Sequence, residues 1–64
     1  MKPQVGEIWY RVTAAGAQYY LTVSKCETQL WKEKHVMYDF INLFTGEAVN
    51  GWLWGAGNGW YKHF

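Results

Sequence analysis

Few side chains in this sequence have the types and spacing that catalysis requires. A thiol nucleophile needs a base whose side chain lies close to it. The only residues in the sequence that could form such a pair are Cys26 with His35 or His63. No motif flanks Cys26, so we interpret it as a small thiol that is buried or lies at an edge. Asp39 stands beside Tyr38, and no second acid is placed to form a catalytic pair. The sequence therefore predicts no catalytic residue and no enzyme activity.

Metal, phosphate and disulfide chemistry have as little support. The two histidines lie far apart, and no Cys/His cluster has zinc-ligand spacing. A single cysteine excludes an intrachain disulfide. The glycine-rich GAGNG, residues 55–59, does not open a helix after a strand, which a phosphate-binding loop requires. We expect neither a metal nor a cofactor.

The length and composition of the chain indicate which structural elements could position a site. The chain has 64 residues, of which half are hydrophobic and one in five is aromatic, including five Trp. A domain this small buries only about 60% of the surface of its unfolded chain. We expect one domain, residues 1–64, with a dense aromatic core, a flexible lead-in over 1–4 and an aromatic surplus on the surface. Aromatic and β-branched residues favour strands.

The charge and hydropathy patterns exclude several classes of protein. The net charge is +1, so neither the basic stripe of a duplex-DNA binder nor the acidity of a DNA mimic is present. No signal peptide and no apolar run of about 18 residues is found. With its lone thiol, the chain is expected in the cytoplasm, away from membranes.

Alternating patterns predict five strands. In the first, Ile8, Tyr10 and Val12 share one face and Glu7, Trp9 and Arg11 the other. Gly46 is expected in a left-handed turn. CETQLWKEKH, residues 26–35, is a long hairpin connection, a strand extension or a helical turn. The expected strands are VGEIWYRV (5–12), QYYLTVSK (18–25), VMYDFINLF (36–44), AVNGWLW (48–54) and WYKHF (60–64).

These elements predict an all-β fold, a small five-stranded antiparallel barrel that is strongly bent. If GAGNG joins a hairpin, Trp54 lies opposite Trp60, Leu53 opposite Tyr61 and Trp52 opposite Lys62. Trp52, Trp54, Trp60 and Phe64 then share a face, with two of the three tryptophans in the core and one partly exposed. A short 3₁₀ turn before the last strand would change this register.

The order VGEIWYRV, YYLTVSK, VMYDFINLFTGE and AVNGWLW resembles SH3-like small barrels, including many phage and prophage proteins. The resemblance spans roughly residues 5–64. A weaker resemblance, Asp39-Phe40-Ile41-Asn42, is similar to the Asp-Tyr-Gly-Asn of Tudor domains, with Ile41 in place of glycine. That resemblance implies an aromatic cage for a methylated basic side chain.

The leading functional hypothesis is a non-enzymatic binding module, a phage-encoded protein that binds and modulates a host protein. Its contact patch is predicted to comprise Trp9, Trp31, Trp52, Trp54, Trp60 and Tyr61, because Trp and Tyr dominate interface hot spots. A homo-oligomer that buries this patch is one alternative. Single-stranded nucleic-acid binding is the other, with bases stacked on aromatics near Arg11, Lys25, Lys32 and Lys34.

Overall fold

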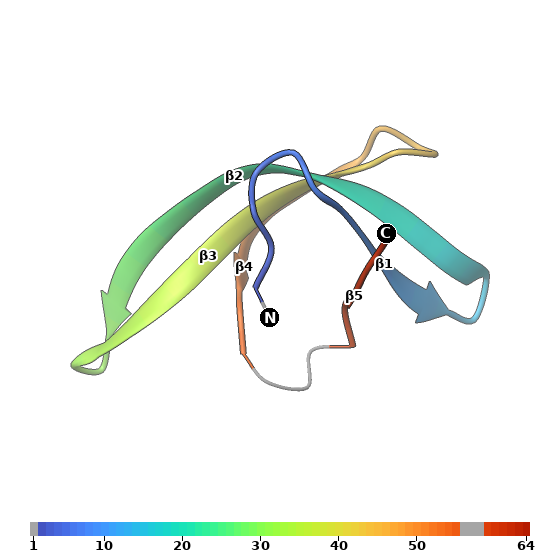
Figure 1. Cartoon of the computed structure of the whole chain (residues 1–64). Coiled ribbons are helices and arrows are strands. Elements are labelled where there is room, and N and C mark those ends of the chain that lie inside the picture. The colour runs from blue at the N-terminus through green and yellow to red at the C-terminus, as the bar shows by residue number, and fades with distance from the viewer. Residues whose placement is uncertain (1, 56–58) are drawn as a thin grey trace.

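The computed structural model describes residues 2–55 and 59–64, which form an antiparallel five-stranded sheet without a helix in those ranges. The order across the sheet is β4-β3-β2-β1-β5 (Figure 1). The all-β prediction is confirmed, but the sheet is open, since no backbone ladder joins β4 to β5 in the described residues. The strands are β1 (Ile8–Thr13), β2 (Gly16–Leu30), β3 (Glu33–Asn42), β4 (Ala48–Leu53) and β5 (Tyr61–Lys62).

Strands β2 and β3 are longer than their sequence patterns predict. Most of the ambiguous segment 26–35 extends them, and only Trp31 and Lys32 form the turn. Both turn residues have positive φ, 49° and 64°, the geometry that hairpins usually reserve for Asn-Gly. We call residues 25–38 the β2–β3 arm, which reaches away from β1 and β5 in Figure 1.

The sheet bends around Asp39. A register shift leaves Val23 as an extra residue in β2, and a second irregularity lies in β4 opposite Asp39; such bulges bend strands and increase their twist. The Ser24 hydroxyl donates to Asp39 Oδ2, and the Gly51 N–H donates to Asp39 Oδ1 at 2.8 Å. These two hydrogen bonds, the Ser24 bond first, lower the pKa of Asp39.

The core fills the concave side of the bent sheet. Its rings meet across the ends of the sheet: Trp60, just before β5, stacks on Phe40 at 4.5 Å between ring centroids and contacts Trp52 of β4 at 5.7 Å. Trp54, just after β4, packs edge-on against Trp9 of β1 at 5.4 Å. Among the described residues, the core consists of the buried residues Trp9, Tyr20, Tyr38, Phe40 and Trp60, with Val36, Val49, Trp52 and Trp54 packed against them.

The predicted hairpin between the fourth and fifth strands is wrong. Strand β5 pairs with β1, with Tyr61 opposite Tyr10, while β4 pairs with β3 on the far side of the sheet. The stacking of Trp60 on Phe40 and its contact with Tyr20 give the reason, because they hold the chain at the free edge of β1. Trp60 is buried and Trp52 and Trp54 are half-buried. Residues 56–58 of the predicted GAGNG loop lie outside the described residues.

Glu7 fastens β5 and the N-terminal lead-in to the sheet. Its carboxylate lies 2.8 Å from Lys62 Nζ and accepts hydrogen bonds from the Gln4 N–H at 2.8 Å and Trp9 Nε1 at 3.2 Å. These contacts, the Lys62 hydrogen bond first, lower the pKa of Glu7 to about 2. Within residues 2–4, Pro3 is buried, whereas Lys2 and Gln4 are exposed.

Candidate functional site: the outer face of the sheet

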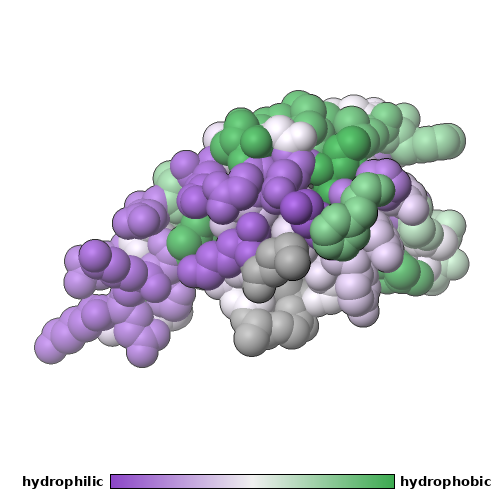
Figure 2. Space-filling model, in the orientation of Figure 1, coloured by the Kyte–Doolittle hydropathy of each residue, from purple (hydrophilic) through white to green (hydrophobic). Residues whose placement is uncertain are grey.

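The convex side of the sheet carries a continuous apolar surface. Strand alternation places the neighbours of the core residues here, in rows such as Ile41–Leu21–Ile8 and Tyr19–Tyr10–Tyr61. Figure 2 shows hydrophobic side chains gathered over this convex side. We call this surface the outer face: Ile8, Tyr10, Val12, Ala17, Tyr19, Leu21, Ile41, Leu43, Ala48 and Tyr61. None of these ten residues is charged; Asp39, which alternation places on the same side of β3 at the bend, has its carboxylate bonded to Ser24 and the Gly51 N–H.

A strip of tyrosines crosses the outer face from β2 to β5. The Tyr10 ring lies 5.1 Å from that of Tyr19 and 5.5 Å from that of Tyr61, measured between ring centroids. His63 packs edge-on against Tyr19 at 5.5 Å and lengthens the strip. Tyr61 retains 54% of its surface exposed to solvent. The strip therefore offers flat, partly exposed rings that are already ordered by one another.

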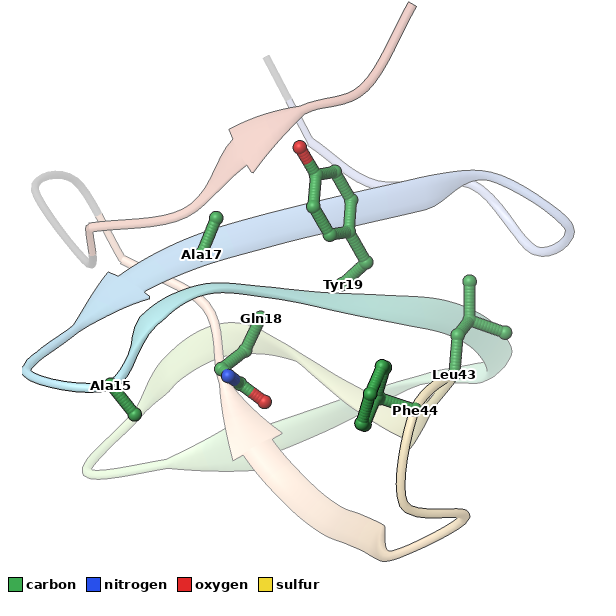
Figure 3. Close-up of a pocket in the computed structure, with 6 residues that line it drawn as sticks. All are labelled: Ala15, Ala17, Gln18, Tyr19, Leu43 and Phe44. Carbon is green, nitrogen blue, oxygen red and sulfur yellow. The ribbon is translucent and has the colours of Figure 1, made fainter.

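A hollow of about 510 Å³ adjoins the outer face where β3 gives way to β4. Ala17 and Tyr19 of β2 flank it on one side, and Leu43 and Phe44 flank it on the other (Figure 3). Gln18 and Ala15 complete the lining. Phe44 is 93% exposed. The hollow has the volume of a typical ligand pocket, about 300–1,000 Å³.

Hydrogen bonds that the Asn42 side chain accepts, together with a left-handed glycine, shape the segment that carries Phe44. Asn42 Oδ1 accepts from the N–H groups of Phe44 and Thr45 at 2.8 and 3.0 Å. Gly46, at φ 76°, donates its N–H to the Asn42 carbonyl at 2.8 Å. The predicted left-handed turn at Gly46 is thereby confirmed, and it turns the chain away from β2 before β4 begins.

The six aromatics of the predicted contact patch are not brought together. Trp9 and Trp60 are 3% and 7% exposed and belong to the core. Trp52 and Trp54 are half-buried against that core. The other two are accessible but separated, since Tyr61 lies on the outer face and Trp31, 85% exposed, lies at the tip of the β2–β3 arm.

The structure places Tyr10 and Tyr19 at the centre of the exposed aromatic strip, and sequence reasoning missed them. Their alternation was visible, because Tyr10 follows Trp9 and Tyr19 precedes Tyr20. Both faces of these strands carry aromatic residues, so alternation alone did not show which face is buried.

The four cations of the nucleic-acid alternative also separate. The Arg11 guanidinium lies on the concave side, about 5 Å from the ring centroids of Tyr20, Trp52 and Trp60. Lys25 pairs with Tyr38 five residues before the end of β2, which is about 17 Å along the strand from the arm tip. Only Lys32 and Lys34 are near that tip, with Glu33 between them.

The Cys26–His35 combination lies on the arm rather than in a pocket. Cys26 is exposed, and it is a diagonal cross-strand neighbour of His35 because Cys26 pairs with Met37 and Thr28 pairs with His35. His35 Nε2 lies 3.8 Å from a Glu33 oxygen. Among the described residues no group of three or more His, Cys, Asp or Glu side chains could hold a metal ion. Those residues also form no helix long and apolar enough to cross a membrane.

Comparisons of this chain with protein-family models, with curated proteins and with solved structures found no match.

Proposed function

We propose that this protein is a non-enzymatic binding module that contacts another protein through the outer face. The observation that carries the proposal is the strip of Tyr10, Tyr19 and Tyr61 set among uncharged aliphatic residues. Interface cores are depleted in charged side chains and enriched in aromatic ones, and contiguous exposed apolar patches mark contact sites. Tyrosine suits such a surface because its ring is apolar while its hydroxyl can remain hydrated before the partner binds.

The absence of Lys and Arg from the outer face favours a protein partner over nucleic acid. Affinity for nucleic acid depends largely on cations that neutralise phosphates, and the cations considered above lie on the concave side or on the arm. The resemblance to phage proteins suggests a host-cell protein as that partner.

We also propose that the bent sheet is a variant of the SH3-like barrel that is closed by rings instead of by a backbone ladder. The Trp52–Trp60 and Trp9–Trp54 contacts span the gap between the ends of the sheet. They support the proposal because in a closed barrel backbone hydrogen bonds would occupy this position.

The proposed function is tested by affinity capture from an extract of the host cell, followed by mass spectrometry. The variant Tyr19→Ser/Tyr61→Ser removes two rings of the strip and lies outside the buried core. The control Phe64→Ser removes a ring that is 90% exposed at the C-terminus. Near-UV circular dichroism confirms that each variant is folded before capture.

We expect the wild type and Phe64→Ser to capture the same protein, and the double variant to lose it by about tenfold or more, as for a hot spot. Equal capture by all three, or no specific capture by the wild type, would refute the proposal. If light scattering shows that the wild type is a dimer and the double variant is a monomer, the outer face binds a second copy of the chain instead of another protein.

A further inference from the structure

Strand β2 continues past the end of β3 and leaves a strand position vacant. Strand β3 ends at Asn42, opposite Tyr20, while β2 extends to Gly16 and pairs there with β1 alone. The Leu43 N–H makes a last bond to the Tyr19 carbonyl at 2.9 Å before the chain turns away. Among the described residues, no strand lies beside residues 16–18 on this side.

The ladder shows which backbone groups face the vacancy. The Thr22 N–H donates to Glu7 O and the Thr22 carbonyl accepts from the Gly6 N–H, so Thr22 bonds toward β1. In an antiparallel strand alternate residues bond to opposite sides; Gln18 therefore bonds toward β1, whereas Ala17 and Tyr19 face away from it. The Ala17 N–H and C=O and the Tyr19 N–H thus point into the vacancy, and such edge groups can template another strand.

The hollow of about 510 Å³ lies at this vacancy. Ala17 and Tyr19, whose backbone groups face it, also line the hollow, together with Leu43 and Phe44. The lining contains no charged residue, so an apolar side chain would enter it without leaving a charge unpaired. The hollow is continuous with the outer face, because Tyr19 and Leu43 belong to both.

We infer that this vacant position binds an extended segment of the partner protein as an added β-strand, with one uncharged, apolar side chain in the hollow. Backbone hydrogen bonds to Ala17 and Tyr19 hold the segment, and the hollow selects its side chain, as in other cases of strand addition. This inference rests on the proposed function and specifies part of its partner. Phe44, almost fully exposed in the free protein, becomes the wall that closes over the bound side chain.

The test uses the capped pentapeptide acetyl-Thr-Val-Leu-Val-Thr-amide and the 64-residue chain labelled with ¹⁵N. In the free protein we expect the Gln18 amide hydrogen to exchange slowly and the Ala17 amide hydrogen to exchange fast. At about 1 mM peptide, a concentration suited to a weak complex, the exchange of the Ala17 and Tyr19 amides should slow while that of Gln18 stays unchanged. An Ala17 amide already protected without peptide, or exchange unaffected by the peptide, would overturn the inference.

Two N-methylated peptides test strand geometry. Because only alternate amides of an added strand face the protein, methylation of the leucine nitrogen and of the next valine nitrogen should have unequal effects. One analogue should bind about tenfold more weakly and the other like the parent. Equal binding of both analogues would overturn strand addition.

Protein variants separate this inference from the proposed function. Phe44→Ser should weaken peptide binding about tenfold, whereas Phe64→Ser, which also removes an exposed ring, should leave it unchanged. Tyr61→Ser should leave peptide binding unchanged and weaken capture of the partner. If the wild type captures the partner but does not bind the peptide, only the strand site is overturned. If the wild type binds the peptide and Tyr61→Ser captures the partner as well as the wild type does, only the outer face is overturned.

Discussion

Replacing Arg11 with methionine tests how the two ends of the sheet are held together. The Arg11 guanidinium lies 5.1 Å from the ring centroids of Tyr20 and Trp60 and 5.4 Å from that of Trp52. Its Nη2 also donates to the Tyr20 hydroxyl at 3.1 Å. Methionine retains an unbranched, flexible stem of apolar contacts but removes the cation and the donor.

The loss can be estimated from these contacts. A cation over aromatic rings contributes about 0.5–2 kcal/mol, depending on its desolvation, and a hydrogen bond contributes about 0.5–1.5 kcal/mol. Because the half-buried Arg11 also loses hydration on folding, we expect a net loss of about 1–2 kcal/mol in the free energy of unfolding. This loss is a large fraction of the total, since a free energy of unfolding of about 0.05–0.15 kcal/mol per residue gives about 3–10 kcal/mol for the whole chain.

Urea unfolding followed by tryptophan fluorescence and far-UV circular dichroism measures this loss. With a slope near 1 kcal/mol per molar urea, Arg11→Met should unfold at about 1–2 M lower urea than the wild type. Arg11→Lys, which keeps the charge but loses the planar donor group, should fall between them. An unchanged or higher midpoint for Arg11→Met would show that the guanidinium stabilises the fold no more than an apolar group does.

Two further predictions concern the carboxylate of Glu7 and the turn of the arm. Because the pKa of Glu7 falls to about 2 from 4.5 in the folded protein, the stability that it contributes is complete above pH 4.5 and is lost as the pH falls toward 2. The melting temperature should therefore fall less steeply with decreasing pH for Glu7→Gln than for the wild type. The exposed control Glu47→Gln should show the wild-type dependence of melting temperature on pH. The same dependence in all three proteins would contradict the role of Glu7. Replacing Trp31 and Lys32 with Asn-Gly should raise the free energy of unfolding by about 1–2 kcal/mol, since non-glycine residues at positive φ are strained, whereas a lower urea midpoint would show that the Trp31 side chain stabilises the arm.

The sequence pattern predicted strands where local residue types decide the structure. Alternation located most of each strand, and Gly46 marked its turn because glycine readily adopts positive φ. Local residue types do not determine the structure of the arm, because its turn residues, Trp31 and Lys32, are not turn formers. The last hairpin failed for a different reason: the partner of β5 depends on where Trp60 packs, and Phe40, on which it stacks, is distant in the sequence.

The candidate site was only partly predictable. Sequence reasoning expected an aromatic surplus on the surface, which exposed Tyr61, Phe44 and Trp31 confirm. It assigned the surplus to the tryptophans, whereas four of the five tryptophans are buried or half-buried. The vacancy beside Ala17 depends on the different lengths of β2 and β3, and no local pattern reports the end of a neighbouring strand.

The two faces of the sheet carry different sets of aromatic residues. The concave side holds four tryptophans together with Tyr20, Tyr38 and Phe40, whereas the aromatic residues of the outer face are the tyrosines Tyr10, Tyr19 and Tyr61. A tyrosine on an uncovered surface keeps its hydroxyl hydrated and still buries a large ring when a partner arrives. A sheet whose second face were permanently covered would not need side chains that combine an apolar ring with a hydrated hydroxyl. Aliphatic residues would pack on such a face equally well. The tyrosine strip therefore indicates that the outer face is solvated in the free protein and covered on binding. The vacant strand position beside it supplies directional backbone hydrogen bonds that an apolar face lacks.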